Sequence, residues 1–541
     1  MLAITVVPWV IYQCLKPRPL RDFPHNPITN ILGDIPELVR LIKNDHICVL
    51  DYLELLVKRH GPVVQMCMGK KVTLLIADQD EIERLYVRGK SVDTSQDLIS
   101  AFQPIIPTGQ NALISNDMWK RHRRIMGPSM HRRYLSRMAH HFSASANQLV
   151  ELWSLKLDLA GGKSFEAASD IKLATMHQLR QFHYRGLVTE LMGLNLGSFI
   201  TGQSFGCLAR ALASTVKSTS AEPALAEFSG CELPPISHAV ETVIASVGFA
   251  FQLPFTSLLF PIYIFFSRKW RRDYNLIRTH LWNCVEEAKK REDTLTQSGD
   301  LLTDADCVID MLIQQEARVG SEPFSKQEML DELTVFILAG QETTTAALAW
   351  FVKFMALDLD IQRRLHEEVC EVFGTSLTDT SSITLEILDD SEKTPVLEAV
   401  LAETLRCALV GSGSKRQLVE DEIIMGRHAP KGTDILALNG LLGLSEAAWG
   451  PDAKRWRPAR WLRPDGSFNR NAGPSGNPFG IGHRACFGQR LAVMQLKIFI
   501  VTLSRAFIFR SVAPAVDVWT STTLVSNQAN VSYVRLDRHE S

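Results

Sequence analysis

The chain has 541 residues, which is enough for one large enzyme or for two or more domains, so length alone does not decide the number of domains. Its hydrophobic share of 46% and charged share of 22% are those of a globular protein with a sizeable core. A net charge of -1 argues against a general nucleic-acid binder, because no overall positive field is available for phosphates. The ten cysteines contain no Cys-x-x-Cys pair, which argues against a disulfide scaffold or a zinc site and favours a reducing compartment.

An apolar run occupies residues 1–15 and is followed at once by Lys16, Arg18 and Arg21. The run is shorter than the roughly 20 residues that span a bilayer, so it can be an uncleaved anchor, a secretory signal or a buried segment. No charge precedes the run and no small-residue cleavage site follows it, which weakens the signal-peptide interpretation. We therefore predict a membrane anchor at residues 1–15, and the positive charges after it predict that the rest of the chain stays on the cytoplasmic side.

The next segments predict a hinge and a small sheet. Prolines at positions 17, 19, 24 and 27 predict a stiff, proline-containing hinge over residues 16–30. Residues 63–68 and 72–76 are rich in apolar and β-branched side chains and are separated by Gly-Lys-Lys, which predicts a hairpin. From Gln79 onward the pattern is helical almost to the end, so we expect a mainly α fold with a small β region in residues 31–541.

A basic segment at residues 116–133 contains Trp119 and Arg123, which share one face of a helix because they are four residues apart. Basic helix faces are usually only solvated, so this motif is weak by itself. The other basic side chains of the segment predict a positively charged surface that suits an acidic protein or, as the alternative, anionic lipid: Lys120, Arg121, Arg124, His131, Arg132 and Arg133.

Three stretches in the middle of the chain lack a simple helical pattern. Residues 176–202 indicate an irregular insertion or an error in the gene model, and the residues do not distinguish the two. Residues 243–266 carry no charge but are interrupted by Pro254 and Pro261, and we expect a membrane-dipping surface beside a substrate channel rather than a membrane span. The polar residues 291–304 predict a loop.

A long helix is predicted to start at Ser325, where Ser325 and Glu328 form a capping box and an apolar pattern follows. Residues 339–344 in its middle read Ala-Gly-Gln-Glu-Thr-Thr. A carboxylate and two hydroxyl groups are costly inside an apolar helix unless they are used. We expect the Thr343 hydroxyl to bond back to the carbonyl of Ala339 and to open the helix locally. The simpler interpretation is a polar patch where a buried helix reaches the surface.

Glu403 and Arg406 lie three residues apart in a later helical pattern and can pair on one helix face. Most such pairs lie on the surface and contribute little to stability. The meaning of this pair therefore depends on its position ahead of the loop around Cys486.

The most specific stretch is the loop Phe-Gly-Ile-Gly-His-Arg-Ala-Cys-Phe-Gly at residues 479–488. We interpret Cys486 as a thiolate ligand of a haem iron, because an electron-donating thiolate in a dry, hydrogen-bonded loop favours cleavage of the O–O bond. Gly482 and Gly488 allow a tight backbone beside a flat macrocycle, and amides at the start of the following helix are expected to lower the pKa of the thiol. Arg484 can reach an anionic propionate. A lone cysteine is more often a small buried hydrophobe, but here five residues, namely Phe, Gly, Arg, Cys and Gly, stand at fixed offsets.

The loop matches the pattern F-x-x-G-x-R-x-C-x-G at every specified position and thereby resembles the haem-binding loop of the cytochrome P450 family. The motifs at Trp119, at residues 339–344 and at Glu403 precede it in the family's order, so the resemblance covers nearly the whole chain. It is a resemblance to microsomal eukaryotic members, and most of all to fungal ones. It implies a mainly α fold with a small β region, in which haem b (iron protoporphyrin IX) lies between the long central helix and the Cys loop.

The resemblance also implies roles for individual residues. Cys486 would be the axial ligand, Thr343 the hydroxyl that steadies bound oxygen, and Glu342 an acidic relay for protons. The other cofactor-binding residues that the family's motifs imply are Trp119, Arg123, Arg416, Arg484, Phe479 and Gly480. A buried structural network would consist of Glu403, Arg406 and Arg460. The sequence departs from the family's commonest pattern at Ala459 and Trp461, but neither change removes the guanidinium group of Arg460. The prolines usual between Arg406 and Arg416 are also absent.

As the family implies, the chain would be a monooxygenase that activates O2 and oxidises an apolar organic substrate, such as a terpenoid, a lipid or another intermediate of secondary metabolism. Electrons would come from NADPH through a separate cytochrome reductase, since the chain has no G-x-G-x-x-G or flavin segment. We expect an endoplasmic reticulum membrane protein whose catalytic domain, residues 31–541, faces the cytoplasm. It would work as a monomer, bind membrane lipid and have no nucleic-acid partner.

The expected walls of the substrate pocket are mainly apolar: residues 99–110, residues 336–339, the segment after Arg406 and the turn near Leu524. Two alternatives stay open. A haem-thiolate isomerase or peroxygenase would share the fold, but the Glu342–Thr343 pair favours activation of O2. A non-catalytic haem-binding or sensor protein would keep Cys486 and have little need of that pair.

Overall fold

In the computed structural model of the protein, the described residues are 16–45, 47, 49–89, 91–178, 211, 215, 217–218, 224–228, 235–253, 255–298, 305, 307–316, 322–377, 379, 381–411, 413–473, 477–514 and 532–539. The predicted anchor at residues 1–15 lies outside this part of the chain, as do residues 179–202 of the predicted insertion and the turn near Leu524.

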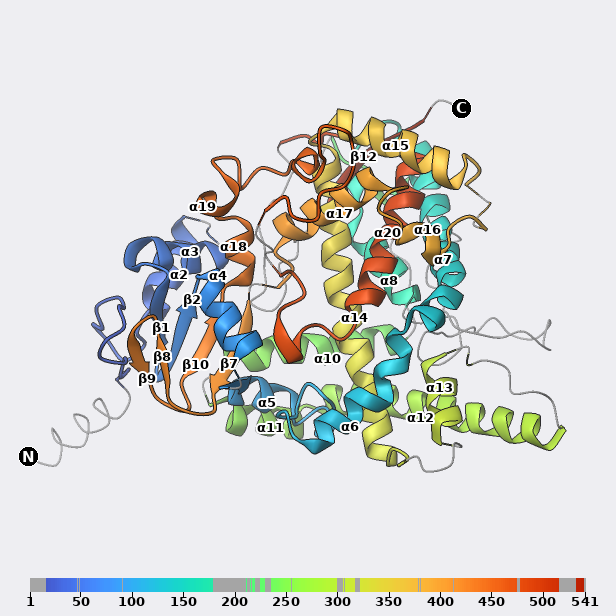
Figure 1. The fold of residues 1–541 in the computed structure, drawn as a ribbon. Helices are drawn as coiled ribbons and strands as arrows, with labels where there is room; N and C mark the ends of the chain where they lie inside the picture. Colours follow the sequence, from blue (N-terminus) through green and yellow to red (C-terminus); the bar gives the residue numbers. More distant parts are fainter. Residues whose placement is uncertain are drawn as a thin grey trace, which may run out of the picture.

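The described chain is mainly helical, and its helices surround the long helix α14 (Lys326–Met355), which crosses the middle of the molecule (Figure 1). The other helices are α2 (Ile35–Asn44), α3 (Val49–His60), α4 (Gln79–Glu83), α5 (Gln96–Phe102), α6 (Asp117–Met126), α7 (Arg132–Ala160), α8 (Ala168–Gln178), α10 (Pro235–Gln252), α11 (Thr256–Phe266), α12 (Arg268–Ser298), α13 (Val308–Glu316), α15 (Leu359–Phe373), α16 (Leu385–Leu388), α17 (Pro395–Ala408), α18 (Asn439–Gly443), α19 (Glu446–Trp449) and α20 (Gln489–Ala506). This architecture confirms the expected mainly α fold with a small β region.

A five-stranded sheet of order β1-β2-β10-β7-β3 lies at one end of the molecule, on the left in Figure 1. Its strands are β1 (Val63–Met68), β2 (Lys71–Ile76), β3 (Val92–Thr94), β7 (Ser414–Leu418) and β10 (Asp434–Ala437). Val63 stands opposite Ile76 in an antiparallel pair, so the predicted hairpin is confirmed. β7 lies between β10 and β3, which places Arg416 opposite Ile435 on one side and Thr94 on the other. The remaining strands are β4 (Phe165–Glu166), β5 (Lys217–Ser218), β6 (Glu227–Phe228), β8 (Glu422–Ile424), β9 (Arg427–Ala429), β11 (Phe507–Arg510) and β12 (Tyr533–Arg538).

Part of the predicted hinge at residues 16–30 is attached to this sheet. Leu20 N donates to Gln65 Oε1 at 2.7 Å, and Gln65 Nε2 donates to the carbonyl oxygen of Phe23 at 2.7 Å. Phe23 itself is buried against the sheet. The hinge at residues 16–30 stays a prediction.

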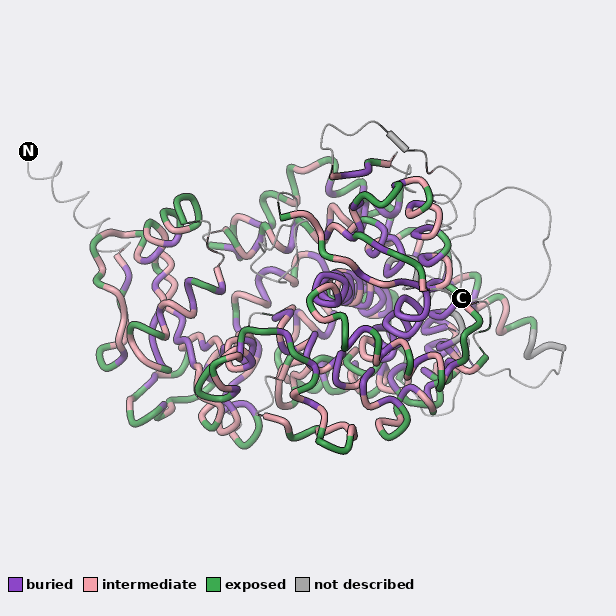
Figure 2. The backbone as a smooth tube through the Cα atoms, turned by 90° about the horizontal axis from the view of Figure 1, so that it is seen from above, coloured by how far each residue is buried: buried purple, intermediate pink, exposed green. Residues whose placement is uncertain are grey.

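α14 forms the centre of the hydrophobic core. It begins at the predicted capping box, in which Glu328 N donates to Ser325 Oγ at 3.3 Å and Ser325 N donates to Glu328 Oε2 at 2.7 Å. Among the described helices it is the one that is long and apolar enough to cross a membrane, but 72% of its most apolar window is buried inside the protein. Figure 2, which looks along α14, shows it as a buried coil near the middle of the molecule. We therefore assign α14 to the protein core.

The predicted loop at residues 291–304 is wrong for its first part, because α12 continues to Ser298. Residues 291–298 contain neither Gly nor Pro, so nothing in the chain ends the helix there. Arg291 also pairs with Asp310 of α13 at 2.8 Å. This contact attaches the extended end of α12 to its neighbour.

The uncharged residues 243–266 form the end of α10 and the whole of α11, with Pro261 inside α11. This region exposes seven large apolar side chains, which we call the α11 patch: Phe249, Phe255, Leu258, Ile262, Tyr263, Phe265 and Phe266. Phe265 and Phe266 are 64% and 74% exposed. Contiguous exposed apolar surface of this kind marks an interaction site.

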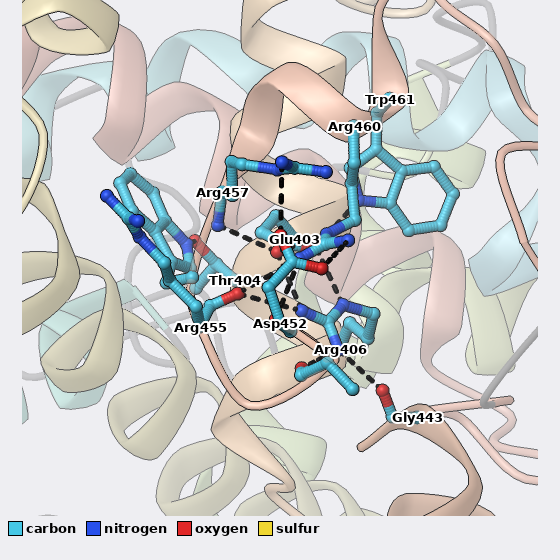
Figure 3. Close-up of polar contacts among 11 residues, drawn as sticks. Glu403, Thr404, Arg406, Gly443, Asp452, Arg455, Arg457, Arg460 and Trp461 are labelled. Atoms are coloured by element: carbon cyan, nitrogen blue, oxygen red, sulfur yellow. Dashed lines mark hydrogen bonds and ion pairs between the residues drawn. The ribbon is translucent and has the colours of Figure 1, made fainter. Parts of the chain in front are cut away.

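Glu403 of α17 is the centre of a buried polar network (Figure 3). Its fully buried carboxylate accepts two hydrogen bonds from Arg406: Nε donates to Oε2 and Nη2 donates to Oε1, both at 2.7 Å. Arg460 Nε donates to Oε1 at 2.9 Å, and Trp461 Nε1 donates to Oε2 at 2.8 Å. Arg406 also donates to carbonyl oxygens within residues 443–455. The network thus joins α17 to the irregular segment that leads to the Cys loop.

Replacing Glu403 with Gln should strongly destabilise the protein, because it leaves Arg406 and Arg460 buried beside a neutral amide. Removing one partner of a buried ion pair typically costs about 3–5 kcal/mol. Thermal unfolding followed by circular dichroism should show a clear drop in the midpoint. The control is Glu367→Gln, which removes an exposed pair with Arg363 and should cost less than about 1 kcal/mol. Equal losses in the two variants would contradict the structural role of the network.

Candidate functional site

The Cys loop, residues 479–488, contains a short 3-10 segment (Gly482–Arg484) and leads directly into helix α20. Cys486 N donates to the carbonyl oxygen of Phe479 at 2.8 Å. Gly488 stands at the N-cap of α20, so the first amides of that helix lie on the sulfur side of the loop.

Two glycines of the loop are required by the backbone. Gly482 has a φ of 76°, and an added Cβ would lie 2.1 Å from the carbonyl oxygen of Tyr86. Gly480 has a φ of 72° and lies against Ser414. Gly488 has an ordinary φ of -86° and no protein atom within 4 Å of an added Cβ, so the space beside it is open. Such open space accommodates the flat group that the sequence predicts here.

The Cys486 thiol borders accessible space, although protein atoms surround most of it. Burial raises the pKa of the thiol, and the backbone N–H of Gly488 and the charge of Arg123 oppose this shift only in part. The expected lowering of the thiol pKa is therefore wrong for the protein groups alone, because loss of water disfavours the thiolate more than one N–H favours it. A coordinated metal ion displaces a thiol proton outright, so these surroundings suit a sulfur bound to iron.

The middle of α14 faces the Cys loop. Phe336 of α14 makes an edge-to-face contact with Phe487 of the loop, with ring centroids 6.1 Å apart. In the middle of this largely buried helix, Ala339 and Thr343 are exposed, and Glu342 is half-buried. Thr343 Oγ1 donates to the carbonyl oxygen of Ala339 at 2.9 Å, which is the bond that the sequence predicts. The predicted local opening is wrong, because α14 is one unbroken helix over Lys326–Met355. A flat apolar group between α14 and the Cys loop would cover the accessible surface on both.

Three arginine side chains meet beside the Cys loop: Arg123 of α6, Arg416 of β7 and Arg484 of the loop itself. Arg484 Nη2 donates to Oδ1 of Asp93 in β3 at 3.2 Å. Arg123 and Arg416 donate to backbone and amide oxygens at 2.7 to 3.5 Å. The Trp119 ring lies 5.3 Å from Cζ of Arg123 and 4.1 Å from Cζ of Arg484. Five predicted cofactor-binding residues therefore share one neighbourhood with Cys486: Trp119, Arg123, Arg416, Arg484 and Phe479.

This cluster carries more positive than negative charge. Among the described residues, Asp93 is the one carboxylate that hydrogen-bonds to any of the three guanidinium groups. The pKa of Arg484 falls to about 10, chiefly because of burial and also because Arg416 and Arg123 repel it. Burial likewise lowers the pKa of Arg123 and Arg416. Because buried charge is costly unless it is paired, this donor set fits a ligand with two carboxylates, such as the two propionates of a haem.

Sequence reasoning missed the residues that hold these arginines. Asp93 also accepts hydrogen bonds from Ser115 N and Oγ, both at 2.8 Å. Tyr86 OH donates to the carbonyl oxygen of Ser414 at 2.7 Å, and its ring lies 5.9 Å from Cζ of Arg416. No local pattern marks these contacts, because Asp93 is 391 positions from Arg484 and Tyr86 is 328 positions from Ser414.

The predicted basic surface exists with one exception. Its exposed members are Lys120, Arg124, His131, Arg132 and Arg133. Arg121 does not belong to it, because its side chain is 18% exposed and pairs with Glu328 Oε1 of α14 at 2.5 Å. For Arg121 the prediction of a docking residue is wrong, since the ion pair turns the side chain inward.

One of the predicted pocket walls borders a cavity beside the Cys loop. A cavity of about 370 Å3 adjoins the Cys loop and is lined by residues that include Leu405, Val410, Phe479, Gly480 and Val493. Of the expected walls it includes the segment after Arg406. Within another predicted wall, Thr108 and Gln110 hydrogen-bond to carboxylates in the first turns of α14.

Comparisons with known proteins agree with this geometry. The family described as Cytochrome P450 matches residues 32–182 and 230–531. Cytochrome P450 monooxygenase GME11363 of Pestalotiopsis microspora is 27% identical, with 97% of this chain and 96% of that protein covered. Cytochrome P450 monooxygenase TRI13 of Fusarium sporotrichioides is 24% identical, with 92% and 91% covered.

A crystal structure of a cytochrome P450 (CYP102L1) matches with a TM-score of 0.70 and 18% identity, covering 97% of this chain and 100% of that chain. At this identity the likeness shows the fold alone. The family match covers most of the chain, and the similar curated proteins are named as fungal monooxygenases. The resemblance stated from the motifs is thereby confirmed: the chain belongs to the cytochrome P450 family and is a haem-thiolate monooxygenase.

Proposed function

We propose that this monooxygenase binds haem b through Cys486 and oxidises an apolar organic molecule, such as a terpenoid, a lipid or another intermediate of secondary metabolism. The observation that carries the proposal is the accessible thiol beside the middle of α14, next to three guanidinium groups that share one carboxylate partner, Asp93, among the described residues. When bound, haem supplies the activation of O2 and the insertion of one oxygen atom into the substrate. The propionate-binding residues are Arg123, Arg416, Arg484 and Trp119, and the loop residues against the cofactor are Phe479 and Gly480.

In this proposal Thr343 and Glu342 handle protons. Thr343 Oγ1 donates its own proton to the carbonyl of Ala339, so its lone pairs remain available to accept a hydrogen bond on the face toward Cys486. Glu342 directly precedes Thr343 in the chain and is half-buried, so its carboxylate can exchange protons with solvent. This acid–alcohol pair favours O2 chemistry over the isomerase, peroxygenase and non-catalytic alternatives.

Electrons come from NADPH through a separate cytochrome reductase in this proposal. The exposed basic side chains of α6 and α7 offer a docking surface for an acidic partner: Lys120, Arg124, His131, Arg132 and Arg133. Opposite charge on the two partners steers encounter and fixes orientation.

We further propose that the protein lies on the endoplasmic reticulum membrane with the catalytic domain in the cytoplasm. The α11 patch supports this location, because an apolar helix surface with Phe265 and Phe266 at its end can dip into a bilayer. α12 begins at Arg268, so basic residues follow the patch directly and can meet anionic head groups.

Replacing Cys486 with Ser should abolish the red-shifted Soret band that thiolate-ligated haem shows when it is reduced and exposed to carbon monoxide. The reason is that a hydroxyl does not replace a thiolate as a soft ligand. The measurement is a difference spectrum of the purified protein beside Cys407→Ser, which changes a cysteine outside the Cys loop and should keep the band. A histidine-type band in the unmodified protein would overturn the proposal.

Replacing Thr343 with Ala should raise the hydrogen peroxide released per NADPH consumed by several-fold, because the proton donor network loses its hydroxyl. The assay uses a cytochrome P450 reductase and laurate as an apolar probe. The control is Thr334→Ala, since Thr334 Oγ1 makes the same kind of bond, to the carbonyl of Leu330 at 2.7 Å, elsewhere on α14. An unchanged ratio in Thr343→Ala would count against the role assigned here.

Replacing both Phe265 and Phe266 with Glu should reduce binding of the full chain to vesicles that contain anionic lipid, measured by co-flotation. Burial of two phenylalanine rings in a membrane contributes about 3–6 kcal/mol in total, so a loss of at least tenfold is expected. The matched control replaces both Leu357 and Leu359 with Glu. These leucines are 55% and 52% exposed at the start of α15, which lies far from α11 in Figure 1. An equal loss in the control would show that the α11 patch has no special part in binding.

A further inference from the structure

Residues 103–116, which connect α5 to α6, are attached to two adjacent carboxylates of α14. Asp331 and Glu332 are both fully buried. Asp331 Oδ2 accepts from Thr108 N at 2.9 Å and from Thr108 Oγ1 at 2.7 Å. Gly109 lies so close to α14 that an added Cβ would be 3.0 Å from Cγ2 of Val335. The connecting segment is therefore held tightly against the first turns of α14.

Glu332 holds the same segment two residues farther along. Its Oε1 accepts from Gln110 N at 2.8 Å, and its Oε2 accepts from Gln110 Nε2 at 2.9 Å. Oε1 also lies 2.7 Å from His122 Nδ1 of α6. One carboxylate thus binds both the backbone and the side chain of Gln110.

His122 supplies positive charge to Glu332. Its ring is fully buried, with Nδ1 at 2.7 Å from Glu332 Oε1 and Nε2 at 3.2 Å from Glu328 Oε1. Burial opposes protonation, but the hydrogen bonds to Glu332 and Glu328 outweigh it and raise the pKa of His122. Both ring nitrogens face carboxylate oxygens, and this geometry together with the raised pKa favours the imidazolium form of His122.

Gln110 in turn contacts two of the three arginines beside the Cys loop, Arg123 and Arg484. Its side-chain oxygen Oε1 accepts a hydrogen bond from Arg123 Nη1 at 3.4 Å. Its backbone oxygen accepts one from Arg484 Nη1 at 3.3 Å. Gln110 is therefore the one described residue that hydrogen-bonds to Glu332, to Arg123 and to Arg484.

We propose that Glu332 is a positioning residue for haem, which acts through Gln110 to orient Arg123 and Arg484 toward the propionates. The inference rests on the proposed function, because it requires that these arginines bind haem. The same contacts hold Gln110 against α14, so the carboxylate that supports retention of the cofactor also fixes one part of residues 103–116. Neither Glu332 nor Gln110 needs to contact haem for this effect.

The segment is also attached to α12, which strengthens the argument that its position is controlled from several sides. Tyr274 OH donates to the carbonyl oxygen of Ile105, and Arg278 pairs with Asp331 Oδ1. Because Asp331 holds Thr108 and Glu332 holds Gln110, the two acids have separable tasks. Asp331 fixes the segment to α12 and α14, whereas Glu332 reaches the arginines.

The test is Glu332→Gln in the haem-containing full chain. The amide oxygen accepts one hydrogen bond, but the NH2 group then faces a donor of Gln110 or His122. We expect transfer of haem to excess apomyoglobin to be about ten- to a hundredfold faster, because a buried hydrogen bond to a charged group is lost. The reduction potential should become more negative, since the propionates lose contact with positive charge. The thiolate-type carbon monoxide band should persist.

Two further variants separate positioning from a loss of stability. Asp170→Asn removes another buried carboxylate, which binds Trp153 and Lys156 between α7 and α8. It should leave the haem-transfer rate and the potential unchanged. Gln110→Met should speed haem transfer several-fold. In the double variant Glu332→Gln/Gln110→Met the combined effect should be clearly smaller than the product of the single effects, because both changes break one chain of contacts.

Several outcomes would overturn the inference. It falls if Glu332→Gln and Asp170→Asn release haem equally fast, or if the Glu332→Gln and Gln110→Met effects multiply. If Glu332→Gln does not fold, an unchanged transfer rate in Gln110→Met would be decisive against it. Absence of a thiolate-type band in the unmodified protein would instead overturn the proposed function, and this inference with it.

Discussion

Positive charge buried beside the Cys loop is the constraint on which much of this structure depends. Arg123, Arg416 and Arg484 meet there, and an unpaired buried charge costs several kcal/mol. The protein supplies only partial compensation, through Asp93 and a set of carbonyl oxygens that come from distant parts of the chain. Three guanidinium groups thus share one carboxylate among the described residues, and this excess of positive charge is what the proposed binding of haem propionates rests on.

The arginine network around Glu403 shows the opposite solution with the same residue type. Arg406 and Arg460 share one fully buried carboxylate, and their remaining donors bind backbone oxygens and Asp452. Because the guanidinium groups of that network are bound by protein groups, the network stabilises the scaffold. The two clusters therefore differ in how many carboxylates the chain itself supplies.

α14 unites the parts of the site along one rigid element. Its first turns hold residues 103–116 through Asp331 and Glu332, and its middle presents Ala339 and Thr343 to the Cys loop. α12 connects this helix to the α11 patch, because Arg278 binds Asp331 and α12 starts directly after α11. α12 and α14 thus connect the α11 patch, residues 103–116 and the arginines beside the Cys loop.

The sequence by itself determined the features that short-range physics specifies: the hairpin before Ala77, the capping box at Ser325, the bond from Thr343 to Ala339 and the loop motif that identified the family. Only the tertiary structure decided the rest. Residues 414–418, Ser-Lys-Arg-Gln-Leu, become a strand because β10 and β3 pair with them on both sides. Arg121 turns inward because Glu328 lies opposite, 207 positions away. Asp93 and Gln110 gain their roles in the same way, since burial and pairing depend on neighbours that no local pattern contains.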